Sequence, residues 1–205
     1  LTGESIILNG FTLTNNTESL RFKLMTKQLY EISYSFEMYF DENSENKLNN
    51  MFQELALVGA FPAVQKENRR YHITLAIYDS IDFEKSKKVL QKFCMSHNQF
   101  KINLGFIGLF KGKENVIFAS PMITNDLIKI HQDFHKEFSW QKKSCWEHYI
   151  PESWQPHCSL TVTTQDAQFP EVLQIIRNKF RPIDVKIKSI GFTFNGEKVN
   201  FNLKE

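Results

Sequence analysis

Two short segments of this chain combine a β-strand pattern with the same pair of polar residues. The first, RRYHITLAIYDS, alternates isoleucine and leucine with other side chains, which predicts a strand with one buried face. Because residues two apart in a strand point the same way, His72 and Thr74 lie together on its opposite face. The second, PHCSLTVTT, gives His157 and Ser159 the same relation. The chain must therefore form a sheet in which each histidine has a hydroxyl group beside it.

These two strands carry groups suited to cleaving a phosphodiester without a metal. If the strands lie side by side, one imidazole can remove a proton from the attacking oxygen while the other protonates the leaving oxygen. The two hydroxyl groups can hydrogen-bond the non-bridging phosphate oxygens. A single His-x-Thr strand more often only satisfies backbone groups in a core. The repetition favours catalysis, although the sequence does not say which histidine is the acid and which the base.

The rest of the chain interleaves predicted strands with predicted helices. Alternating segments predict strands at residues 30–40, 100–110, 115–123, 184–194 and 198–205. Helical stripes begin after the candidate N-caps Asp41, Asn43 and Ser44 and after Asp82. Further helices are predicted at residues 124–138, with Thr124 or Asn125 as the cap, and at residues 171–180. Asn195–Gly196 is a strong hairpin signal between the last two strands. Hairpin-like pairs flanking helices favour an α+β fold with mainly antiparallel sheets over a doubly wound parallel sheet.

Composition places few limits on function. The 205 residues are 41% hydrophobic and 23% charged, which is typical of one globular domain, and the net charge of +2 does not indicate a nucleic-acid groove. The three cysteines lack metal-like spacing, and the sequence has no apolar run of about 18 residues and no signal-peptide pattern. These features predict a cytoplasmic protein with reduced thiols. We expect residues 1–29 to be an N-terminal extension, with Met25 a candidate natural start, and residues 30–205 to be a single bilobal domain.

The segments HITL and HCSL, with Pro156 and Trp154 just before the second, resemble the paired motifs of the 2H phosphoesterase superfamily. The branch most similar is that of the bacterial 2′-5′ RNA ligase-like proteins and RNA 2′,3′-cyclic phosphodiesterases. The resemblance covers residues 30–205 in element order and motif spacing. It implies an α+β, LigT-like fold with pseudo-twofold symmetry, in which two mainly antiparallel sheets flanked by helices surround a central cleft.

The resemblance also implies an activity and a set of roles. The expected reaction is metal-independent cleavage of 2′,3′-cyclic phosphates on RNA ends or nucleotides, or of 2′-5′ linkages, without a cofactor. Carried over by position, His72 and His157 form the acid–base pair, and Thr74 and Ser159 bind the phosphate. The expected partner is an RNA end or a small nucleotide, with no metal and no membrane, and the protein is expected to be a monomer.

Four residues outside the motifs have a second interpretation. Tyr149 and Trp154 belong to a long aromatic loop and either contact the substrate, by stacking on a base, or cover the core. His131 and His135 have the spacing of helical metal ligands, but the sequence HQDFH lacks the glutamate of the H-E-x-x-H motif. We therefore expect no metal site there.

Two other functions remain open from the sequence. The same chemistry would suit a phosphodiesterase that degrades a cyclic or 2′-5′-linked signalling oligonucleotide. A protein of a different class, a non-catalytic module that binds RNA or nucleotides in the same cleft, would also keep this fold. The intact histidines and hydroxyl groups of both motifs argue against the module.

Overall fold

The computed structural model describes residues 6–8, 11–13, 33–58, 70–111, 115–164 and 167–205, and it divides the chain into two compact units. Residues 1–33 contain a small antiparallel pair, β1 (Ile6–Leu8) and β2 (Phe11–Leu13). Residues 34–205 form the larger unit. The domain boundary expected at residue 29 and the candidate start at Met25 lie outside the described residues and stay predictions.

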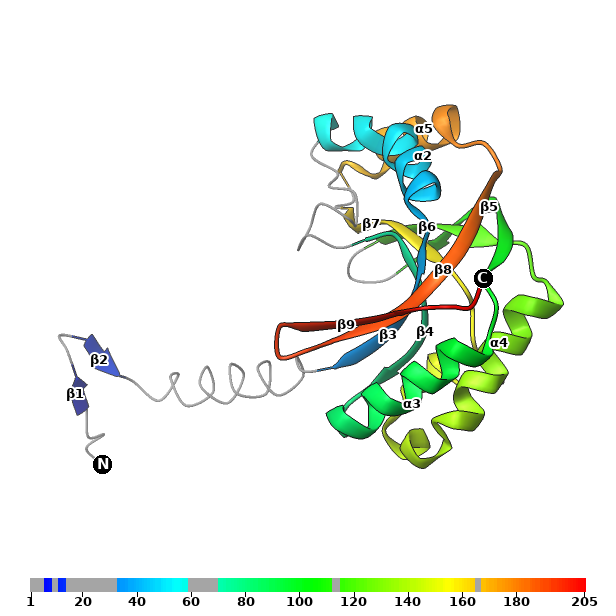
Figure 1. The fold of residues 1–205 in the computed structure, drawn as a ribbon. Helices are drawn as coiled ribbons and strands as arrows, with labels where there is room; N and C mark the ends of the chain where they lie inside the picture. Colours follow the sequence, from blue (N-terminus) through cyan, green and yellow to red (C-terminus); the bar gives the residue numbers. More distant parts are fainter. Residues whose placement is uncertain (1–5, 9–10, 14–32, 59–69, 112–114, 165–166) are drawn as a thin grey trace. The chain divides into compact units, whose positions relative to one another are not determined.

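The larger unit is built on one seven-stranded sheet in which all the strand pairs are antiparallel (Figure 1). The strands follow the order β4-β3-β8-β5-β6-β7, and β9 pairs with β8. Their bounds are β3 (Tyr34–Phe40), β4 (His72–Tyr78), β5 (Phe100–Phe110), β6 (Asn115–Pro121), β7 (Cys158–Thr164), β8 (Ile183–Phe194) and β9 (Glu197–Asn202). The α+β fold with mainly antiparallel pairing is confirmed.

The strand β8 joins the two predicted sheets into one. One edge of β8 pairs with β3, while its other edge pairs with β5 near its start and with β9 near its end. β8 and β9 are connected by Asn195 and Gly196, whose φ angles of 48° and 85° are those of the predicted hairpin turn. The two halves of the fold therefore share a continuous hydrogen-bonded backbone.

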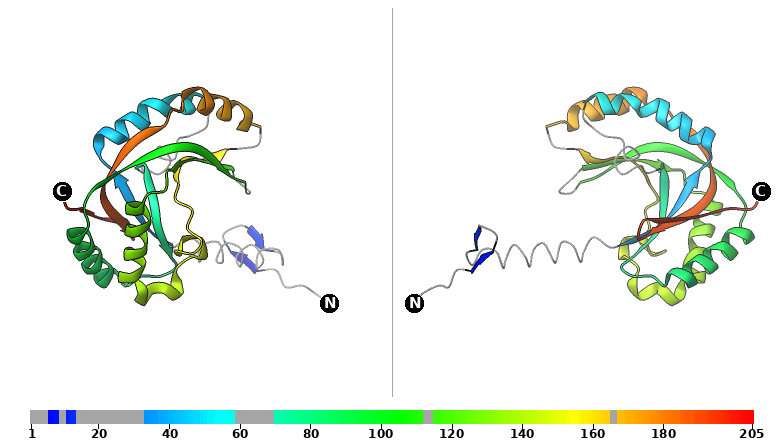
Figure 2. Two further views of the ribbon diagram at one scale, coloured as in Figure 1. Left: turned by 90° about the vertical axis from the view of Figure 1, so that its right-hand side faces the viewer. Right: turned by 60° about the vertical axis from the view of Figure 1, so that its left-hand side comes forward.

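The two strands at the ends of the strand order come together in space. β4 and β7 contact one another although neither pairs with the other in the sheet, which curves to bring them close (Figures 1 and 2). Burial raises the pKa of the Cys158 thiol to about 12, and a hydrogen bond with the His72 backbone opposes that shift. The strands that carry the two motifs are therefore neighbours.

Four helices cover the sheet: α2 (Glu42–Phe52), α3 (Phe83–Ser96), α4 (Asn125–Glu137) and α5 (Phe169–Lys179). The predicted caps form at the first three, where Asp41, Asp82 and Thr124 each accept a backbone N–H three residues ahead. Figures 1 and 2 show α2 with α5 at one end of the unit and α3 with α4 at the other. None of the helices in the described ranges is long and apolar enough to span a bilayer.

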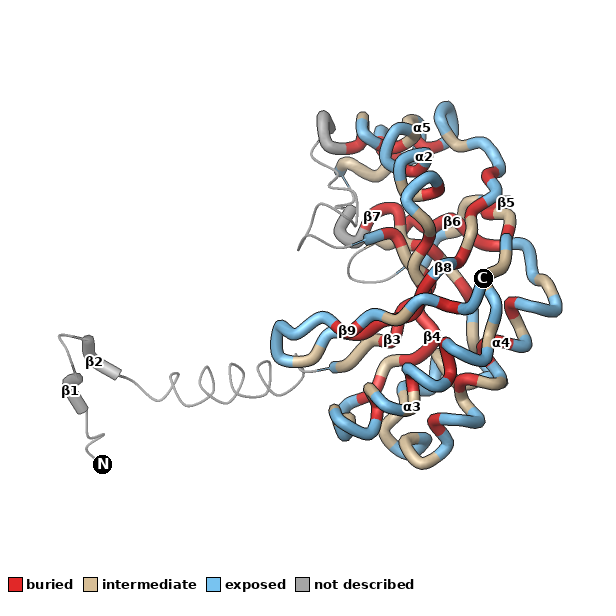
Figure 3. The backbone as a smooth tube through the Cα atoms, in the orientation of Figure 1, coloured by how far each residue is buried: buried red, intermediate tan, exposed pale blue. Residues whose placement is uncertain are grey.

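Phenylalanine rings fill much of the interior between the sheet and α4. Phe36 of β3 lies 4.6 Å from Phe192 of β8 and 5.4 Å from Phe134 of α4, measured between ring centres. All three rings are buried, and Figure 3 shows buried positions running along the central strands. This packing fixes one face of β3 in the core and turns its polar residues to the opposite face of the sheet.

Candidate active site

Cross-strand pairing brings a carboxylate and a phenol to the first motif. In the register of β3 with β4, Tyr39 lies opposite His72 and Glu37 lies opposite Thr74. The Tyr39 hydroxyl donates to Glu37 Oε2 at 2.7 Å, and the other carboxylate oxygen, Oε1, lies 3.5 Å from His72 Nε2. Only 8% of the Glu37 surface is exposed. A buried carboxylate therefore sits directly beside the first motif histidine.

The second motif histidine has an aromatic surrounding instead. In the register of β6 with β7, Phe118 lies opposite Ser159. The His157 ring packs against Phe110 of β5 and Phe118 of β6, with ring centres 4.9 Å and 5.4 Å away. Phe118 can lie over β5 because its partner there is Gly108, where an added Cβ would overlap the ring.

Both histidines are held in the same way by the chain that precedes them. His72 Nδ1 lies 2.7 Å from the Arg70 carbonyl oxygen, and His157 Nδ1 lies 2.8 Å from the Gln155 carbonyl oxygen. Because a carbonyl only accepts, each Nδ1 carries a proton and donates it. The Nε2 atom of each ring is then the one left for proton transfer.

His72 also acts electrostatically on His157. Burial lowers the pKa of His157, and the neighbouring His72 lowers it further, against the opposing effect of the Gln155 carbonyl. His157 is therefore held in its neutral form at neutral pH. Its Nε2 has no hydrogen-bond partner among the residues that the structure describes, so the lone pair is free to accept a proton.

A cavity of about 520 Å³ opens beside the second motif. His157 and Ser159 line it, together with the rings of Phe110, Trp146 and Tyr149. Within the described part of the chain, no lysine or arginine is among the lining residues. The cavity therefore offers aromatic faces and hydroxyl groups rather than fixed positive charge.

The two predicted aromatic contacts have different surroundings. Burial raises the pKa of Tyr149, and the Glu37 charge raises it further, so this tyrosine connects the cavity to the first motif. The Trp154 indole N–H donates to the Thr74 carbonyl oxygen at 2.9 Å, and its ring stacks on His131 with centres 3.7 Å apart. Trp154 thus holds the motif strand in place, and its predicted contact with the substrate stays a prediction.

His131 and His135 of α4 hydrogen-bond to backbone carbonyl groups. His131 Nε2 lies 3.1 Å from the Leu75 carbonyl oxygen and 3.0 Å from that of Tyr149, and His135 Nε2 lies 3.3 Å from the Leu75 carbonyl oxygen. A nitrogen that faces carbonyl oxygens donates a proton and cannot also bind a metal. In the described part of the chain, no group of three or more histidine, cysteine or acidic side chains could hold a metal ion.

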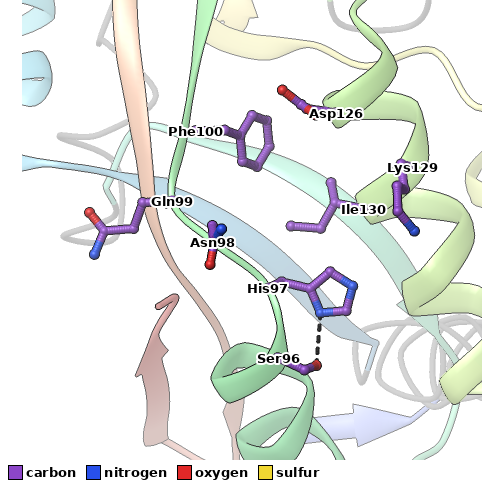
Figure 4. A pocket seen from close by; sticks show the side chains of 8 residues that line it. All are labelled: Ser96, His97, Asn98, Gln99, Phe100, Asp126, Lys129 and Ile130. Atoms are coloured by element: carbon purple, nitrogen blue, oxygen red, sulfur yellow. Dashed lines mark hydrogen bonds between the residues drawn. The ribbon is translucent and has the colours of Figure 1, made fainter. Parts of the chain in front are cut away.

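A second cavity, of about 380 Å³, lies where α3 ends, between the start of β5 and α4 (Figure 4). Here His97 contacts the Ser96 hydroxyl at 3.1 Å and Asp133 at 3.2 Å, an order of groups that resembles a catalytic triad. The Ser96 hydroxyl, however, donates to the Phe93 carbonyl oxygen at 2.8 Å, and His97 Nδ1 lies 2.9 Å from the same oxygen. These groups close the end of α3 and have no free nucleophile.

Sequence reasoning missed Glu37 and Phe110. Glu37 belongs to the polar face of a strand whose alternation was visible, but which polar residue meets His72 depends on the register of β3 with β4. Phe110 ends a long strand and has no local signal of function. Pairing the polar face of residues 30–40 with the first motif in several registers would have made Glu37 a candidate.

The sequence of residues 47–194 matches the family model of the 2′-5′ RNA ligase superfamily. The matched range covers more than half of the chain and contains both motifs. The chain belongs to this superfamily. The expected membership of the 2H phosphoesterases is thus confirmed at the level of the superfamily, and the bacterial branch stays a prediction. A search of curated proteins finds no match.

Several solved structures have a fold similar to that of this chain. LigT of E. coli, without ligand, has a TM-score of 0.54 and 14% identity, covering 84% of this chain and 94% of its own. The protein TT0787 of Thermus thermophilus has a TM-score of 0.54 and 14% identity, covering 84% and 96%. A further structure, described as a phosphoesterase, has a TM-score of 0.53 and 12% identity, covering 84% and 98%. At these identities the likeness shows the fold.

Proposed function

We propose that this protein is a metal-independent phosphodiesterase that opens 2′,3′-cyclic phosphates on RNA ends or nucleotides, or cleaves 2′-5′ linkages. One observation carries the proposal. Two motif histidines on adjacent strands are each tied through Nδ1 to the carbonyl two residues earlier, and His72 lowers the pKa of His157. Two imidazoles on contacting strands, each with Nε2 left for proton transfer, suit in-line displacement at one phosphorus atom.

The surroundings of the histidines favour one division of roles. Neutral His157 is the base: its Nε2 takes a proton from water, whose oxygen forms a bond to phosphorus. His72 is the acid: as the bond from phosphorus to the ribose oxygen breaks, its Nε2 gives a proton to that oxygen. In the protonated His72 ring, Nδ1–H donates to the Arg70 carbonyl and Nε2–H faces Glu37. Thr74 and Ser159 stabilise the charge on the non-bridging oxygens.

The cavity beside His157 supports a nucleotide substrate. Its volume of about 520 Å³ is within the range of small-ligand sites, and Phe110, Trp146 and Tyr149 offer rings on which a base can stack. One solved structure of E. coli LigT, with a TM-score of 0.51 and 13% identity to this chain, is complexed with 3′-AMP. A terminal nucleotide or a small cyclic nucleotide therefore fits the site better than an internal stretch of RNA.

The test compares turnover of 2′,3′-cyclic nucleotides and 2′-5′ dinucleotides in the presence of EDTA. Wild-type protein is expected to cleave at least one of them, while His72→Ala and His157→Ala lose about 10²–10⁴-fold in kcat/KM. His97→Ala, which changes a histidine that does not line the cavity beside His157, is the matched control and should retain activity.

Two outcomes of this test would overturn the proposal. Nucleotide binding without turnover would favour the non-catalytic module. Turnover that EDTA abolishes would show a metal-dependent reaction. A preference for 2′-5′-linked or cyclic oligonucleotides over 2′,3′-cyclic ends would identify the substrate as a signalling molecule while leaving the chemistry unchanged.

A further inference from the structure

The negative charge of the Glu37 carboxylate would repel the phosphate that the proposed site binds. Glu37 is 8% exposed, and its Oε1 atom lies 3.5 Å from the Nε2 of the proposed acid, His72. We propose that Glu37 acts as a charge filter, making the site accept singly charged phosphodiesters and reject doubly charged phosphomonoesters. This inference rests on the proposed function, because it concerns the substrate class of the same site.

The distances place the carboxylate within reach of a bound phosphate. A phosphate oxygen that accepts a hydrogen bond from His72 Nε2 lies about 2.8 Å from that nitrogen. With Glu37 Oε1 only 3.5 Å from the same nitrogen, the two negative groups lie within roughly 6 Å of one another. The Tyr39 hydroxyl holds the other carboxylate oxygen at 2.7 Å, so Glu37 is fixed in this position.

The local charge suits one negative charge on the ligand rather than two. Glu37 balances the positive charge of a protonated His72, and the described lining of the neighbouring cavity contains no lysine or arginine. The nearby Arg70 already has partners: it donates to Glu45 at 2.7 Å and to the Phe40 carbonyl oxygen at 2.8 Å, and its guanidinium lies over the Tyr39 ring. A phosphodiester carries one negative charge, whereas a phosphomonoester carries about 1.5 to 2 at pH 7.

The fold itself does not demand a carboxylate here. The residue opposite the hydroxyl of the first motif is Glu37, but the residue opposite the hydroxyl of the second motif is Phe118. Glu37 also has a consequence for turnover. Opening a cyclic phosphate converts a diester into a monoester, so the same carboxylate that admits the substrate repels the product and favours its release.

The experiment uses two ligands that differ by one ester group. A 2′-deoxynucleoside 3′-phosphate and its methyl ester share base and sugar, and neither has the 2′-hydroxyl needed for internal attack. Their Kd values for wild type, Glu37→Gln, Glu37→Asp and the control Glu54→Gln are measured by calorimetry at pH 7. Glu54 is a surface carboxylate paired with Lys179, so its variant removes one charge outside the site.

We expect wild type to bind the diester about tenfold more tightly than the monoester. For one charge at about 6 Å, the effect ranges from ~3-fold in a water-like dielectric to ~100-fold at an effective value of about 20. Glu37→Gln should bind both ligands more tightly than wild type, and the improvement should be about tenfold larger for the monoester, because the repulsion removed scales with the charge of the ligand. Glu37→Asp and Glu54→Gln should keep the wild-type preference.

Three results would overturn the inference. A wild type without preference for the diester would do so even if Glu37→Gln failed to fold. A Glu37→Gln variant that keeps the preference would exclude a role for this charge; if its two Kd values change by the same factor, Glu37 acts only by positioning His72. No binding of either ligand to any variant would overturn the proposed function as well.

Discussion

The two motif histidines share a local structure and differ in their neighbours. Each donates from Nδ1 to the carbonyl two residues earlier, at 2.7 Å for His72 and 2.8 Å for His157. Yet β3 supplies a carboxylate to His72, whereas β5 and β6 supply two phenylalanine rings to His157. Pseudo-symmetric strands can therefore become chemically unequal through the residues opposite them, and in the proposed function this inequality makes one histidine the acid and the other the base.

A substrate whose leaving group needs no proton should separate the two histidines most strongly. With a phosphodiester that releases 4-nitrophenolate, His72→Ala should lose less than about tenfold in kcat/KM, because the acid is dispensable. His157→Ala should still lose about 10²–10⁴-fold, since water must be deprotonated. Release of 4-nitrophenolate is followed by absorbance. Equal losses of kcat/KM in the two variants would contradict separate acid and base roles. A larger loss in His72→Ala would make His72 the base.

The hydroxyl groups should behave alike where the histidines differ. Removing either one, by Thr74→Val or Ser159→Ala, should lower kcat about 10²-fold with a smaller change in KM, because each stabilises charge that develops on the phosphate. Steady-state kinetics on the cleaved nucleotide check this. Thr193→Val, which changes an exposed threonine of β8, is the matched control and should have no effect. An effect of one hydroxyl alone would place the phosphate against a single strand.

A third histidine, His131, tests what burial does to an imidazole outside the site. Burial, together with His135, lowers the pKa of His131 to about 3 from 6.5. Below pH 6.5 His131 becomes protonated in the unfolded chain but stays neutral in the folded protein. The free energy of unfolding therefore decreases as the pH falls. The expected contribution is about 2 kcal/mol between pH 6.5 and pH 5.

Chemical denaturation at pH 7 and pH 5 measures this contribution. His131→Gln can still donate an N–H to the Leu75 carbonyl but cannot be protonated, so its free energy of unfolding should fall less than that of wild type. His135 and His157, whose pKa values burial also lowers, are present in both proteins and cancel in the comparison. An equal fall in the two proteins would contradict the prediction.

The smallest expected effect concerns Phe110, whose ring packs against His157. The pKa of His157 lies below 6.5, so the rising limb of kcat/KM against pH, where the base loses its proton, should lie below pH 6.5. Phe110→Ala admits water to the ring and should move this limb upward by about half a unit. Phe106→Ala, an exposed ring on the same strand, is the control. A limb that stays in place would show that Phe110 does not desolvate His157.

The sequence was sufficient for the elements and for the motif pairs, for reasons visible in particular residues. The alternation of HITLAIY correctly predicts that Ile73 and Leu75 are buried, and Asp41 and Asp82 mark helix starts through their own side-chain bonds. The alternation is wrong for the end of β4, where Ala76 and Tyr78 are buried and Ile77 is only half-buried, because the pairing of β3 with β4 has a register shift at Leu75. Asn195–Gly196 fixes the hairpin because few other residues adopt positive φ. These are local interactions, which the order of residues specifies directly. The four predicted site residues remain predictions until their variants are measured.

The sequence by itself determined the strands, the helices and the pairing of each histidine with a hydroxyl two residues on, because a strand repeats every two residues wherever it lies. Only the tertiary structure decided that β4 and β7 meet, that Glu37 faces His72 and that Phe110 and Phe118 enclose His157. Those contacts join segments far apart in the chain, and their register and the curvature of the sheet depend on packing that involves the whole core.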